Sequence, residues 1–134
     1  MRTLLSVFFF VAAAGSMSWQ LEAAAPVITE RTTEVVAVRN LSVKDGVVSG
    51  DLANQSPRPV RDVELLIRYV WHWKNEFRPG KESPGMAVYH TVEGEIPPGE
   101  SRRFVYTPPS PLPSRLDGTF ETIVAVAGFS EVFR

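Results

Sequence analysis

Three aromatic residues occupy alternate positions in one short segment of the chain: Tyr69, Trp71 and Trp73. Alternate residues of a β-strand project from the same face, so this spacing gathers three rings on one surface. An exposed surface of this kind could stack against sugar rings. The same spacing also suits a buried stripe, because apolar residues of the same parity precede the rings: Val63, Leu65 and Ile67. The pattern favours a core position for the rings and leaves a carbohydrate-binding platform as the alternative.

The residue types that bind metals or transfer protons form no recognisable motif. His72 and His90 are the only histidines, and the chain has no cysteine. A protein metal site needs at least three convergent ligands, usually with short spacing between some of them. Glu93 and Glu95 would share one face of an extended segment, but they lie beside a turn, where solvent reaches them. The sequence therefore predicts no catalytic residue, no metal, no cofactor and a protein that is not an enzyme.

The elements that position these side chains are predicted to be β-strands. Apolar residues alternate with more polar ones along the run that contains the three rings, which is the period of a strand. Other runs rich in valine or aromatic residues lie between turns rich in proline and glycine. The predicted strands are Glu34–Leu41, Val47–Leu52, Val63–Trp73, Met86–Val92, Arg102–Tyr106 and Phe120–Phe129. This order predicts an all-β fold, an antiparallel immunoglobulin-like β-sandwich of about seven strands.

The connection Phe77–Gly85, with the sequence FRPGKESPG, contains two Pro-Gly pairs and is predicted to be a loop. Loops above a rigid sandwich often carry binding residues. The strand end before this loop would also be partly exposed. We therefore expect a contact surface formed by Trp73, Phe77, Arg78, Lys81 and Glu82. The alternative, equally compatible with the sequence, is that this loop only connects two strands and is exposed to solvent.

The N-terminus has the features of a secretory signal. A positively charged residue precedes the apolar run Leu4–Ala14, and small residues follow this run. The predicted signal peptide is residues 1–25, with cleavage after Ser18 as the alternative, and residues 26–134 form a single domain. An uncleaved anchor formed by Thr3–Leu21 is the other interpretation, and only this interpretation attaches the protein to a membrane.

The composition excludes several classes of partner and of covalent attachment. The formal net charge is −1 and basic residues form no long run, which argues against nucleic-acid binding. The lack of cysteine excludes a lipid attached through cysteine, a disulfide framework and a thiolate metal site. The predicted signal peptide indicates a periplasmic or extracellular protein. Without disulfides, its domain is expected to fold on its hydrophobic core alone.

Two segments, VVSGDLANQSPRPVRDVELLIRYV and IPPGESRRFVY, resemble the FxLYD-type domain and related bacterial immunoglobulin-like modules. The residues that follow the family pattern are Gly50, Asn54, Ser56, Pro59, Val60, Val63, Tyr69, Pro98, Gly99, Glu100 and Phe104. The resemblance implies an immunoglobulin-like sandwich in an exported or membrane-tethered protein. It implies no catalytic residue.

These observations predict a non-enzymatic module that binds or scaffolds an unidentified protein partner in the cell envelope. The alternative is a carbohydrate-binding module that uses Tyr69, Trp71 and Trp73, and this alternative requires the rings to face outward.

Overall fold

The computed structural model describes residues 31–134, so the predicted signal peptide lies outside the described residues. Within this range the chain forms six strands and one short helix. The elements are α1 (Arg31–Val35), β1 (Val36–Lys44), β2 (Val47–Asn54), β3 (Val60–Trp73), β4 (Met86–Ile96), β5 (Ser101–Tyr106) and β6 (Gly118–Glu131). The predicted all-β class is confirmed.

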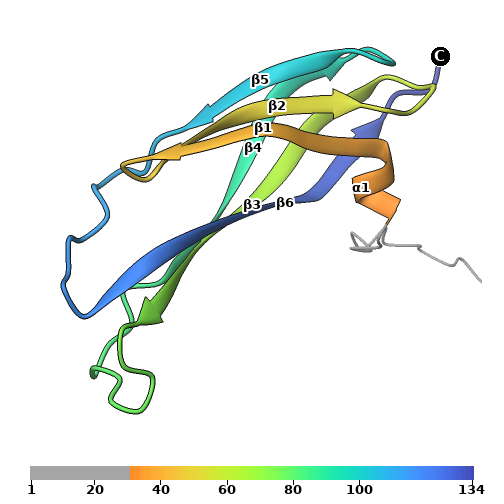
Figure 1. Cartoon of the computed structure of the whole chain (residues 1–134). Coiled ribbons are helices and arrows are strands. Elements are labelled where there is room, and N and C mark those ends of the chain that lie inside the picture. Colours follow the sequence, from red (N-terminus) through yellow and green to blue (C-terminus); the bar gives the residue numbers. More distant parts are fainter. Residues whose placement is uncertain (1–30) are drawn as a thin grey trace, which may run out of the picture.

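The strands form two antiparallel sheets of three strands each. In the first sheet β2 lies between β1 and β5, and in the second sheet β3 lies between β4 and β6. The strand that carries the three aromatic rings is therefore the central strand of its sheet. Figure 1 shows the two sheets one above the other, with the end of β3 and the beginning of β6 reaching beyond the first sheet.

The hydrophobic core draws on all six strands. Its buried residues are Val36, Val48, Leu52, Val60, Val63, Leu65, Ile67, Tyr69, Val92, Ile96, Phe104 and Val126. The inward stripe predicted for β3 is confirmed, because its alternate residues from Val63 to Ile67 have no exposed surface. Phe104 of β5 is also buried. Residues from both sheets meet in this cluster, so one apolar interior holds the strands together.

Tyr69 connects the two sheets through a hydrogen bond. Its hydroxyl group donates to the carbonyl oxygen of Gly46 at 2.6 Å, in the turn between β1 and β2. Gly46 has a φ of 81° and the preceding Asp45 a φ of 52°, a left-handed pair typical of a tight hairpin. Burial raises the pKa of the Tyr69 hydroxyl above its ordinary value of 10.0, and the nearby Tyr106 adds to this effect.

Asn54, the last residue of β2, fixes the connection to β3. The side chain is buried, and its Nδ2 donates to the carbonyl oxygens of Arg58 at 2.8 Å and Ile96 at 2.9 Å. Its Oδ1 accepts from the backbone N–H of Ser56 at 3.0 Å and from the Ser56 hydroxyl at 2.7 Å. The turn that begins at Asn54 is therefore closed by the side chain of the asparagine itself.

The observed strands differ from the predicted ones mainly at their ends. Glu34 lies in α1 rather than in the first strand, and β1 continues to Lys44. The fourth strand was expected to end at Val92 but runs on to Ile96. Gly94, with a φ of 101°, lies where the pairing of β3 and β4 shifts, so a bulge lets the strand continue past it.

Candidate functional site

One end of the second sheet carries the residues expected to make contacts. β3 ends at Trp73, β6 begins at Gly118, and these two residues are paired. The loop after β3 and the loop before β6 therefore meet the sheet at the same end. We call this end, formed by residues 71–85 and 115–120, the tip. In Figure 1 the tip lies at the lower left, beyond the first sheet.

A cluster of aromatic rings forms the base of the tip. The ring centroids of Trp71 and Phe120 are 4.8 Å apart. Those of Trp71 and Trp73 are 5.8 Å apart, with an interplanar angle of 87°. The guanidinium carbon of Arg115 lies 5.2 Å from the Trp71 centroid and 5.3 Å from the Trp73 centroid. Edge-to-face ring contacts and cation–π contacts are both attractive, so the base is a packed unit.

Arg115 also joins the two loops of the tip. Its Nε and Nη2 donate to the two carboxylate oxygens of Asp117 at 2.9 Å and 2.5 Å. Its Nη1 donates to the carbonyl oxygen of Glu82 in the other loop at 3.4 Å. The hydrogen bond from Arg115 lowers the pKa of the Asp117 carboxyl group, and the same bond raises the pKa of Arg115. Both groups therefore stay charged across the physiological pH range.

The five residues expected to make contacts all lie at the tip, but they differ in their surroundings. Trp73 is half-buried and lies beside Gly80, where a Cβ atom would be 2.8 Å from Cη2 of the ring. Glu82 meets Arg115 through its backbone. Phe77, Arg78 and Lys81 are exposed, and the Phe77 side chain is 97% exposed.

The second loop also contributes to the tip, although the sequence pattern does not indicate this. Leu116 is 97% exposed, and it lies beside Arg115 at the edge of a hollow of about 440 Å³. The hollow is lined by His72, Trp73, Lys74, Arg115, Leu116, Gly118 and Thr119. A single sequence marks Leu116–Gly118 only as a turn, because the pairing that brings this turn to Trp73 is not local.

A carbohydrate-binding platform requires the three rings of β3 to face outward, and two of them face inward. Tyr69 is 1% exposed and Trp71 is 8% exposed, so neither ring offers a face to a sugar. Both rings share the inward parity of β3, and the core and the tip cover them. Trp73 is the one ring of the three that is partly accessible.

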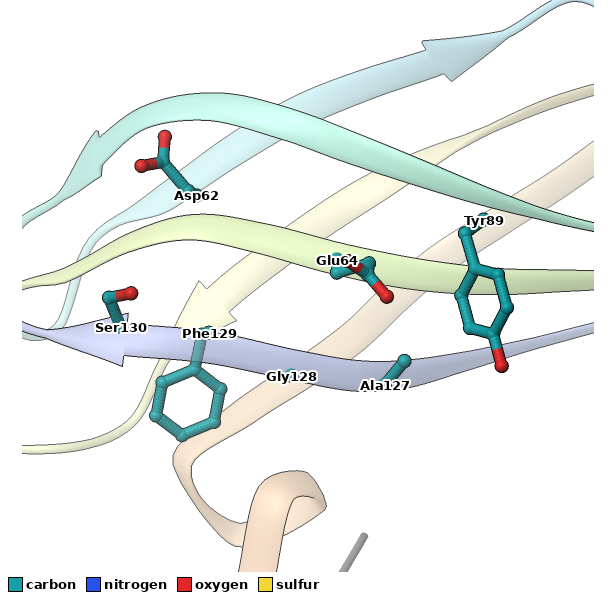
Figure 2. Close-up of a pocket in the computed structure, with 7 residues that line it drawn as sticks. All are labelled: Asp62, Glu64, Tyr89, Ala127, Gly128, Phe129 and Ser130. Atoms are coloured by element: carbon teal, nitrogen blue, oxygen red, sulfur yellow. The ribbon is translucent and has the colours of Figure 1, made fainter. Parts of the chain in front are cut away.

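A second hollow, of about 310 Å³, lies over the outer face of the second sheet (Figure 2). It is lined by Asp62, Glu64, Tyr89, Ala127, Gly128, Phe129 and Ser130. The Asp62 carboxylate accepts from the backbone N–H of Gly94 at 3.3 Å, and Figure 2 shows it pointing toward β4 and away from Glu64. The two carboxylates do not converge as a pair of catalytic acids would.

Residues 31–134 contain no group of three or more histidine or acidic side chains placed to hold a metal ion. Over the same range, none of the helical structure has the length and apolar character that crossing a membrane requires.

Comparison with known proteins adds no relative from which a site could be transferred. No family model, no curated protein and no solved structure matches this chain.

Proposed function

We propose that the protein is an exported, non-enzymatic module with an immunoglobulin-like sandwich of the FxLYD type. In this proposal it binds or scaffolds a protein partner in the cell envelope, in the periplasm or outside the cell. The signal-like N-terminus supports export. The two antiparallel sheets around one core support the sandwich.

The observation that carries the proposal is the exposure of two large apolar side chains at the tip. Phe77 and Leu116 are each 97% exposed, and they come from the two loops that Arg115 joins. Apolar side chains scattered singly over a surface are ordinary, but here the two belong to the two loops that extend from the packed base of tryptophan and arginine. Tryptophan and arginine are enriched among the residues that dominate binding energy, so the tip has the composition of an interaction surface.

Capture of envelope proteins on the immobilised chain tests this proposal. We expect the wild-type chain to retain a discrete protein, and the double variant Phe77→Ser/Leu116→Ser to retain it at least about tenfold more weakly. The matched control is Val105→Ser/Phe133→Ser, which removes exposed apolar groups away from the tip. The control should bind as the wild type does. Equal retention by the tip variant and the wild type would refute the proposal.

A further inference from the structure

β6 is an edge strand whose second edge is unpaired in the described part of the chain. It pairs with β3 on one side, and no strand within residues 31–134 pairs with its other side. The pairing with β3 runs without a register shift from Gly118 to Val126. Helix α1 and strand β1 both contact β6, but β1 belongs to the first sheet and does not pair with β6. Figure 1 places α1 near the C-terminal half of β6, away from the tip. The N-terminal half of β6 therefore presents a regular edge of backbone donors and acceptors.

The other three edge strands carry features that discourage pairing with a further strand. β1 has a register shift near Asn40, which has a φ of 53°. β4 contains the bulge at Gly94. β5 is short and carries two adjacent arginines, Arg102 and Arg103. Bulges, short length and charges are the usual protections of an exposed edge.

The regular part of β6 has no bulge, is longer than β5 and carries little charge. Between Gly118 and Val126 the sequence is GTFETIVAV, with one charge, Glu121, and no proline. Phe120, Thr122 and Val124 share the inward face, because they pair with inward residues of β3, and each is partly exposed. Partial exposure on the inward face is expected where a sheet ends without a neighbour.

We propose that β6 pairs antiparallel with β6 of a second copy of this chain, about a two-fold axis at Thr122. Thr122 is the midpoint of the regular stretch, so this register uses the whole stretch from Gly118 to Val126. It places Phe120 opposite Val124 of the second copy, and Thr122 opposite Thr122. The two second sheets then join into one continuous sheet across the dimer.

The self-complementarity of this register is the reason for choosing a second copy as the partner. A two-fold dimer needs one surface that matches itself. Aromatic residues opposite β-branched residues, and threonine opposite threonine, are favourable cross-strand pairs. Each Glu121 lies opposite Ile123, so the two carboxylates do not face each other. An axis at Glu121 would bring them together, and an axis at Ile123 would run into the register shift beyond Val126.

Two variants with opposite charges at Ile123 distinguish an effect on the dimer from an effect on the folding of the monomer. In the proposed register, Ile123→Lys faces Glu121 of the second copy, whereas Ile123→Glu puts two carboxylates opposite each other. Within one chain Ile123 pairs with Arg68, so the glutamate variant gains an attraction there and the lysine variant gains a repulsion. The effect on the monomer is thus opposite in sign to the effect on the dimer.

Sedimentation velocity of the full chain over a concentration series measures this difference. We expect a wild-type dimer, and dissociation of Ile123→Glu at concentrations at least about tenfold higher than those of Ile123→Lys. A wild-type chain that stays monomeric throughout overturns the inference. The reverse order of the two variants, or equal dissociation, also overturns it, because the dimer then uses another surface.

Cross-linking checks the register directly, since the chain has no cysteine of its own. The Cβ atoms of two Thr122 residues on the axis would be about 4.5–5.5 Å apart. Two Thr119 residues would be six positions apart along the strands, roughly 20 Å. Under oxidation Thr122→Cys should give a covalent dimer and Thr119→Cys should not. Cross-linking of both variants to the same extent, or of neither, would contradict the register.

Discussion

Asn54 and Tyr69 show how single buried polar side chains hold neighbouring segments in place. Asn54 uses both donors of its amide group on backbone carbonyls and uses its oxygen to accept from Ser56. An aspartate at this position could accept but not donate, so the site specifies asparagine. Tyr69 reaches from the second sheet to a turn of the first sheet. Each residue joins segments that the strand pattern alone would leave unconnected.

Removal of the Tyr69 hydroxyl should weaken the contact between the sheets. Tyr69→Phe leaves the carbonyl oxygen of Gly46 without its buried donor, so we expect the free energy of unfolding to fall by about 1–2 kcal/mol near neutral pH. Urea denaturation measures this change. Tyr89→Phe is the control, because the Tyr89 side chain is 65% exposed and its hydroxyl can bond to water. A loss in Tyr89→Phe equal to that in Tyr69→Phe would contradict the explanation.

The same bond predicts a pH dependence. The folded pKa of Tyr69 lies above 10.0, so the unfolded chain loses this proton first as the pH rises. The unfolded state then gains relative to the folded state, and the contribution of Tyr69 to stability is present below pH 10.0 and is lost as the pH rises through the folded pKa. The difference between the wild type and Tyr69→Phe should therefore shrink between about pH 8 and about pH 11. An increase in this difference in the free energy of unfolding over the same pH range would contradict the prediction.

Two glycines of β6 differ in whether the surrounding atoms leave room for a side chain. A Cβ atom on Gly118 would overlap the carbonyl oxygen of His72 and the ring of Trp71, whereas a Cβ atom on Gly128 would meet nothing within 4 Å. We expect Gly118→Ala to lower the free energy of unfolding by about 1–3 kcal/mol, because the end of β6 must move away from β3. Gly128→Ala should change it by less than about 0.5 kcal/mol. Thermal denaturation of both variants tests this prediction. Equal losses of stability in the two variants would contradict it.

A structural feature was predictable from the sequence when the residues that cause it lie close together along the chain. The inward stripe of β3 was predictable, because alternation along a strand is a local pattern that burial enforces. The loop after β3 was predictable from its Pro-Gly pairs. The role of Arg115 was not, because it arises from the pairing of Trp73 with Gly118 and from ring contacts between distant segments. The number of sheets, and which strands lie at their edges, likewise depends on pairing that no short segment specifies.

At the scale of the whole molecule, the shared core predicts that the two sheets unfold together. Leu52 of the first sheet and Leu65 of the second are both fully buried in the same cluster. Leu52→Ala and Leu65→Ala should each lower the free energy of unfolding by about 2–5 kcal/mol, because each leaves a cavity in that cluster. The effect of Leu52→Ala should reach the second sheet, although Leu52 belongs to the first.

Tryptophan fluorescence provides the reporter for this prediction, because Trp71 and Trp73 lie at the tip of the second sheet. In a Trp19→Phe background these two residues are the only tryptophans of the chain. If one core governs both sheets, Leu52→Ala will shift the urea midpoint seen by fluorescence as far as the midpoint seen by circular dichroism. If the first sheet unfolds alone, the circular dichroism midpoint will shift while the fluorescence midpoint stays in place. Leu65→Ala is the matched control, since it must shift both midpoints if the second sheet unfolds as one unit.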